Sequence, residues 1–172
     1  MKWVIFVLSM MLLFKPVTAK ELSVNQANQI REMFEGIIGG FAYRHEHNYC
    51  RVIKNLGKDA VSCEIYQTFV DGKGNKHSEL ATRIDLDYIE NEEPPIAKPS
   101  QIKQINDYDV QIWYDKIYAG PRSKEILMTT YVIRPKQSIK ITMTCWQNHK
   151  CYAEQLINQV NKQNVSRIIG RN

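Results

Sequence analysis

Two cysteines on either side of a short turn place the strongest constraint on the fold of this chain. Cys50 and Cys63 flank Asn55-Leu56-Gly57-Lys58, and the stretches on both sides are rich in aromatic and β-branched residues. A hairpin with Leu56 and Gly57 as its two-residue loop places Cys50 directly opposite Cys63. Facing residues of an antiparallel pair bring their β-carbons within reach of a disulfide. The sequence therefore predicts a crosslinked hairpin of fixed register.

The other two cysteines, Cys145 and Cys151, stand near the C-terminus. Cys145 lies on the apolar side of a predicted strand, and Cys151 opens a predicted helix, so a bridge between them would hold the helix against the sheet. An even number of cysteines in an exported protein is typical of disulfides. Zinc is a poor alternative, because no closely spaced pairs of cysteine or histidine surround these residues.

The first nineteen residues have the pattern of a cleaved secretory signal. Lys2 precedes an apolar run over 4–14, and the segment ends in small residues at Ala19. The run has 11 residues, whereas a membrane-spanning helix needs about 20. We therefore expect residues 20–172 to form a single, soluble domain in the periplasm or outside the cell, with no membrane span.

The remaining chain predicts an α+β fold with a helix at each end. Ser23 and Gln26 have the spacing of a capping box, apolar residues then recur at helical intervals to Ile38, and Gly39-Gly40 would end this helix. A second helical pattern begins at Cys151. Between the helices, alternating patterns predict an antiparallel sheet of about six strands, over 41–53, 60–70, 80–88, 110–118, 126–132 and 139–145.

These strands group into two three-strand meanders joined by a proline-rich loop. Residues 90–100 contain Pro94, Pro95 and Pro99, which fix the backbone and remove donors. With Pro135-Lys136 as the loop between the last two strands, Ile139 faces Val132, Ile141 faces Thr130 and Met143 faces Met128. The apolar side chains of both strands would then share one face of the sheet, on which the C-terminal helix packs.

Aromatic side chains gather on the opposite face in this arrangement. They are Tyr43, Tyr49, Tyr66, Trp113, Tyr131 and Trp146. Exposed aromatics at this density are typical of a recognition surface. The alternative is that the N-terminal helix, or a second copy of the chain in a homodimer, covers this face as a second core layer.

A metal site is a further hypothesis. His45 and His47 would point to the same side of a strand, and the adjacent strand carries Glu64. Two imidazoles and a carboxylate are suitable ligands for a metal ion such as zinc. No further ligand is fixed by the sequence, so a histidine pair without a metal is the simpler interpretation.

An acidic run precedes and enters the proline-rich loop. It comprises Asp85, Asp87, Glu90, Glu92 and Glu93. The spacing differs from that of a calcium loop, which favours a solvated strand end. Glu92 and Glu93 are nevertheless candidates for contact with a protein partner, because the neighbouring prolines lower the entropy cost of ordering the loop.

Several classes of function lack their signatures. The chain has no Gly-X-Ser-X-Gly motif, and His149, between the last two cysteines, has no evident partner in the sequence. The net charge of +5 would fall by two without Lys2 and Lys15, and basic residues are scattered, so nucleic acid is not an expected partner. No cofactor is indicated.

The function expected from these features is binding. We expect an exported, non-catalytic protein of the inhibitor, immunity or envelope-accessory type that recognises a protein partner. The alternative is a small secreted enzyme, or a metal- or ligand-binding protein, that uses His45, His47 and Glu64.

Overall fold

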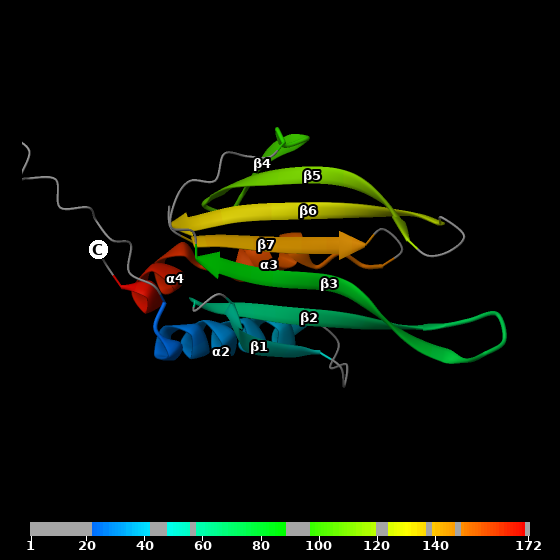
Figure 1. Cartoon of the computed structure of the whole chain (residues 1–172), viewed down its shortest axis with the longest axis horizontal. Helices are drawn as coiled ribbons and strands as arrows, with labels where there is room; N and C mark the ends of the chain where they lie inside the picture. Colours follow the sequence, from blue (N-terminus) through cyan, green and yellow to red (C-terminus); the bar gives the residue numbers. More distant parts are fainter. Residues whose placement is uncertain are drawn as a thin grey trace, which may run out of the picture.

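The computed structural model describes residues 22–41, 48–55, 58–88, 97–119, 124–136, 139–146 and 149–170. These residues form three helices and one antiparallel sheet of seven strands (Figure 1). The helices are α2 (Val24–Phe41), α3 (Ala153–Gln159) and α4 (Lys162–Ile169). The strands are β1 (Tyr49–Asn55), β2 (Lys58–Val70), β3 (Lys76–Tyr88), β4 (Gln101–Ile105), β5 (Tyr108–Ala119), β6 (Lys124–Lys136) and β7 (Ile139–Trp146).

The α+β class is confirmed, and the strand count is one higher than predicted. The strand order is β1-β2-β3-β7-β6-β5-β4. A three-strand meander, β1 to β3, therefore joins a four-strand meander, β4 to β7, through the pairing of β3 with β7. In Figure 1 the hairpin of β2 and β3 continues well past the neighbouring strands.

The additional strand is β4, which forms a hairpin with β5. Ile105 pairs with Tyr108, so Asn106 and Asp107 make a two-residue turn. Asn106 has a φ of 54°, a left-handed conformation that asparagine tolerates better than most residues. The first four residues of β4 are exposed, which is why its apolar pattern is weak in the sequence.

The N-terminal helix begins with the predicted capping box. The Ser23 backbone N–H donates to Gln26 Oε1 at 2.9 Å, and the Gln26 N–H donates to Ser23 Oγ at 3.2 Å. Its buried stripe is Ala27, Ile30, Phe34 and Ile38, as the periodicity predicts. The predicted end at Gly39-Gly40 is wrong: both glycines are helical, and α2 continues to Phe41.

All three helices pack on one face of the sheet. Helix α2 contacts β1 and β2, α3 contacts β4 and β7, α4 contacts β6, and α2 also contacts both other helices. The predicted C-terminal helix is two helices, because Val160 is extended and Asn161 starts α4 by accepting from the Gln163 N–H. The Gln26 side chain donates to the carbonyls of Ile168 and Ile169, which joins the start of α2 to the end of α4.

The crosslinked hairpin is confirmed. Cys50 faces Cys63 in the β1–β2 register, and the two sulfur atoms are bonded. The second predicted bridge, Cys145–Cys151, is also present. Two disulfides therefore link β1 to β2 and the end of β7 to the segment that enters α3.

The predicted register of β6 and β7 is wrong. Ile141 faces Ile133 and Met143 faces Tyr131, and the turn follows Lys136 rather than including it. The registers differ by an odd number of residues, which exchanges the two faces of β6. Met128, Thr130 and Val132 consequently point away from the helices.

A bulge changes the side on which Leu80 lies. Ile65 pairs with Thr82 and Tyr66 pairs with Leu80, so Ala81 is the extra residue of β3. Alternation along 80–88 would put Leu80 on the same face as Thr82, Ile84 and Leu86. The last three are buried under the helices, whereas Leu80 shares the opposite face with Tyr66.

None of the helices in the described part of the chain is long and apolar enough to cross a membrane. The predicted signal segment, residues 1–19, lies outside the described residues.

Candidate functional site

The sheet face turned away from the helices, which we call the open face, is the candidate site. No helix of the described ranges packs on it, because α2 contacts both α3 and α4 on the other side. Most of its side chains are partly buried, while Val132 and Ser62 retain only 8% and 2% of their exposure. The open face divides into two halves of different chemistry.

The charged half comprises the open-face residues of β1 to β3. Its polar and charged members are Tyr49, Arg51, Ser62, Glu64, Tyr66, Arg83, Asp85 and Asp87, and the apolar Ile53 and Leu80 lie on the same face. At its centre, the hydroxyls of Tyr49 and Tyr66 both donate to Oε2 of Glu64 at 2.8 Å. The Arg51 guanidinium lies 5.5 Å from the centre of the Tyr49 ring. Cross-strand pairing brings Tyr49 to Glu64, and strand alternation brings Tyr66 to the same face.

A second carboxylate of this half is held in the same way. Ser62 Oγ donates to Asp85 Oδ1 at 2.7 Å, and Arg83 Nε lies 2.9 Å from Asp85 Oδ2. Ser62 faces Asp85 and Glu64 faces Arg83 in the β2–β3 register. Both carboxylates are therefore bound by side chains of the protein itself.

The pKa values of this cluster reflect these contacts. Burial opposes ionisation of Glu64, but hydrogen bonds from Tyr49 and Tyr66, with the charges of Arg51 and Arg83, lower its pKa overall. The hydrogen bond to Glu64 raises the pKa of the Tyr49 and Tyr66 hydroxyls. Glu64 is thus an anion and both tyrosines are neutral donors near neutral pH.

The tryptophan half comprises open-face residues of β5 to β7. They are Trp113, Met128, Thr130, Val132, Thr142, Thr144 and Trp146. Thr130 lies at the centre, because it faces Trp113 on one side and Thr144 on the other. Charged residues of these strands on the same face lie at the margins and include Asp109, Asp115, Arg134 and Lys140.

Trp113 is fixed by the segment that precedes β4. Its indole N–H donates to the Ala97 carbonyl at 3.2 Å. Ser100 Oγ accepts from the Tyr114 backbone N–H at 3.3 Å, which anchors the same segment to β5. The indole ring is therefore held in place before any partner binds, which reduces the entropy cost of binding.

Tyr131 does not belong to the open face, contrary to the prediction. It faces Met143, a fully buried residue, and packs against the core beside α3. Burial and the nearby Glu154 carboxylate raise the pKa of its hydroxyl. The odd shift of the β6 register explains this error, whereas Tyr49, Tyr66, Trp113 and Trp146 do share one face.

The other predicted site residues lie outside the described residues. They are His45, His47, Glu92 and Glu93, together with Tyr43. The proposed metal ligand Glu64 is described, and its carboxylate is occupied by two tyrosine hydroxyls. Within the ranges that the structure covers, no three histidine, cysteine or acidic residues are grouped closely enough to bind a metal ion.

Two features of the structure were not predicted. Thr130, at the centre of the tryptophan half, was not predicted to lie there because the wrong register assigned it to the core. His149 has a partner after all: its Nε2 lies 2.8 Å from Glu79 Oε2. Glu79 belongs to the long β2–β3 hairpin, and a pair this distant in sequence gives no local signal.

Comparison of the chain with protein-family models, with curated proteins and with solved structures finds no significant match.

Proposed function

We propose that this chain is an exported, non-catalytic binding protein that recognises a protein partner through the tryptophan half of the open face. The observation that carries the proposal is a tryptophan-containing surface on a rigid sheet, with no helix of the described residues over it. Tryptophan is enriched among the residues that dominate the energy of protein interfaces. Threonine and methionine between the two tryptophans add contact area without a charge that a partner must neutralise.

The chemistry of this half indicates the partner's surface. An uncharged centre with charges at its margins matches a partner that presents apolar side chains in the middle and polar groups around them. The charged half is a less favourable binding surface, because a partner would have to replace the contacts that already bind Glu64 and Asp85.

The cysteines support a location in an oxidising compartment. All four cysteines of the chain are bridged, and disulfides persist in oxidising compartments such as the periplasm or the extracellular space. Roles that fit such a protein are those of an inhibitor, an immunity protein or an accessory factor of the cell envelope.

Affinity capture by residues 20–172 from the native envelope or secretions, read by mass spectrometry, tests the proposal. The Trp113→Ala/Trp146→Ala variant should lose the captured protein, and purified partner should bind it at least about thirtyfold more weakly. Tyr114→Ala is the matched control, because Tyr114 is 58% exposed but points to the helix side of β5. Equal binding by the double variant and the wild type would refute the proposal.

A further inference from the structure

The two disulfides differ sharply in their access to solvent. Cys50 and Cys63 are 8% and 0% exposed, so that bridge joins two buried residues. In the second bridge Cys145 is 3% exposed, whereas Cys151 is an exposed residue. A thiolate from solution can therefore approach the second bridge at Cys151, and exchange rates depend on such access.

The buried sulfur of the second bridge has a hydrogen-bond donor beside it. Thr82 Oγ1 lies 3.6 Å from Cys145 Sγ. The same oxygen atom accepts a hydrogen bond from the Tyr152 backbone N–H at 3.2 Å. A disulfide sulfur carries no hydrogen, so the Thr82 hydroxyl is the donor in this contact. Thr82 is fully buried, and a donor in such surroundings stabilises an anion more than it would in water.

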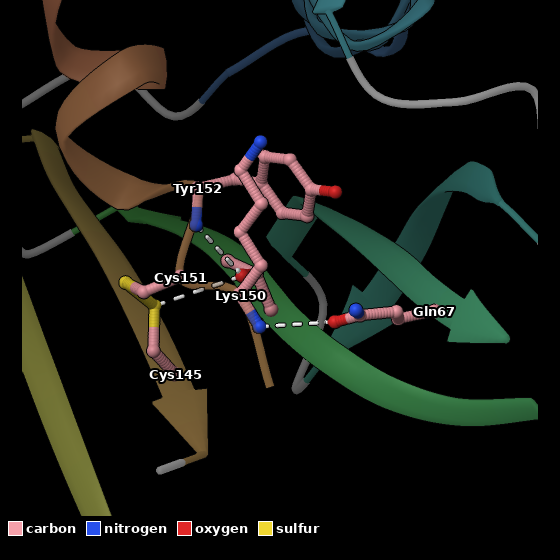
Figure 2. Close-up of a disulfide and its surroundings, with 6 residues drawn as sticks. Gln67, Cys145, Lys150, Cys151 and Tyr152 are labelled. Carbon is pink, nitrogen blue, oxygen red and sulfur yellow. Dashed lines mark hydrogen bonds between the residues drawn. A yellow bond between two sulfur atoms is a disulfide. The ribbon is translucent and has the colours of Figure 1, made fainter. Parts of the chain in front are cut away.

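The segment around Cys151, residues 149–152, is bound to the sheet by contacts other than the sulfur–sulfur bond. The Lys150 backbone N–H donates to Gln67 Oε1 at 2.9 Å (Figure 2). His149 Nε2 contacts Glu79 Oε2 at 2.8 Å. Together with the Tyr152 contact, these bonds fix the segment that carries Cys151 against β2 and β3. Opening the disulfide would leave the two sulfur atoms close enough to reform it.

We propose that Cys145–Cys151 is a thiol-exchange site whose substrates are thiolates, either of small thiols or of protein dithiols. The incoming thiolate attacks Cys151 Sγ and forms a mixed disulfide there. The Cys145–Cys151 bond breaks, and its electron pair remains on Cys145 Sγ as a thiolate. This thiolate accepts a hydrogen bond from the Thr82 hydroxyl. Cys50–Cys63 takes no part in the exchange.

A dithiol substrate completes the reaction. Its second thiolate attacks the substrate sulfur of the mixed disulfide, the bond to Cys151 breaks, and Cys151 leaves as a thiolate that takes a proton from solvent. The substrate is thereby oxidised to a disulfide by two electrons, and the Cys145–Cys151 bridge is reduced by the same two electrons.

Glutathione is the probe for the test. Purified residues 20–172 are incubated with reduced glutathione, quenched with acid, alkylated and mapped by mass spectrometry over time. We expect Cys145–Cys151 to open at least about tenfold faster than Cys50–Cys63, with the glutathione adduct on Cys151. An adduct on Cys145, or equal opening of both bridges, would overturn the proposal.

Substitution of Thr82 tests the role of its hydroxyl. Thr82→Val should slow the opening of Cys145–Cys151 about tenfold, because the leaving thiolate loses its donor. Thr129→Val, which changes the residue that faces Cys145 on the other neighbouring strand, should leave the rate unchanged. Thr82→Ser retains the hydroxyl and should restore the rate, which separates chemistry from any folding defect of the valine variant. A valine variant that folds and exchanges at the wild-type rate would show that the hydroxyl does not assist the leaving thiolate.

Discussion

The two halves of the open face belong to one sheet but differ in their central side chains, which are charged and internally bound in one half and uncharged in the other. In the charged half, Glu64 is bound by two tyrosine hydroxyls, and Asp85 is bound by a serine and an arginine. In the tryptophan half, the central side chains are uncharged, and none of them needs a counter-ion. The first half is satisfied within the molecule, whereas the second half gains most from contact with another surface.

The difference shows that aromatic residues on a sheet do not all serve the same purpose. Tyr49 and Tyr66 orient their hydroxyls toward one carboxylate, so their polar ends are already engaged in the free protein. Trp113 and Trp146 present large apolar surfaces that are partly exposed. Position alone would group all four as one binding surface, and the Glu64 carboxylate bound by the two tyrosines separates the pairs.

A charge placed in the tryptophan half should produce the largest effect. Thr130→Glu puts a carboxylate between Trp113 and Thr144, and burying it without a partner would weaken binding by about a hundredfold or more. Calorimetric titration with the captured partner measures the change. Thr68→Glu, the same substitution on the open side of the β2–β3 hairpin, is the control and should bind normally. Unchanged affinity of Thr130→Glu would place the contact surface elsewhere.

Truncation of Tyr131 should affect stability but not binding. Because this side chain packs against the core beside α3, Tyr131→Ala should lower the free energy of unfolding by about 2 kcal/mol. Urea unfolding gives this value, and titration with the partner should show unchanged affinity. If a folded Tyr131→Ala variant lost affinity for the partner, Tyr131 would have to be counted as part of the binding surface.

Neutralising Glu64 should destabilise the charged half by a smaller amount. Glu64→Gln keeps the size of the side chain but gives the hydroxyls of Tyr49 and Tyr66 a weaker acceptor, which should cost about 1 kcal/mol at a partly exposed position. Urea unfolding at neutral pH measures the loss. Binding that weakens as much as in Thr130→Glu would contradict the division into two halves.

The stability that Glu64 contributes should also depend on pH, with the smallest effect of the four. Its pKa is lowered by folding, so the contribution is fully present above the unfolded value of about 4.3 and disappears as the pH falls through the folded value. The difference in unfolding free energy between wild type and Glu64→Gln should be constant from pH 7 to 6 and shrink toward pH 3. A difference in unfolding free energy that grows as the pH falls would show that folding raises, rather than lowers, the pKa of Glu64.

Local signals made one hairpin predictable and another not. The turn at Leu56-Gly57 and the pairing of Cys50 with Cys63 agree on one register, which the structure confirms. At the β6–β7 connection the prediction placed Pro135 in the turn, but Pro135 is a buried residue of β6 beside a register shift. Both faces of β6 carry apolar side chains, so hydrophobicity could not reveal the odd shift.

The candidate site was predictable to the extent that its strands were. Trp113 and Trp146 follow from the alternation of β5 and β7, and Tyr49 and Glu64 follow from the confirmed hairpin register. The contacts of Asp85 with Ser62 and Arg83 needed the order and register of β2 and β3, including the bulge at Ala81. Pairing between distant strands leaves no trace in local periodicity.

The contact between Gln26 and the end of α4 imposes an order of events during biosynthesis. The amide of Gln26 finds its carbonyl partners 142 and 143 positions later in the chain, and the Lys136 ammonium donates to the Gly170 carbonyl at the same place. A nascent chain therefore cannot complete the contacts of α2 until Ile168 and Ile169 have been made. Every described strand of the sheet is synthesised before that point, so the joining of α2 to α4 is a late event in folding.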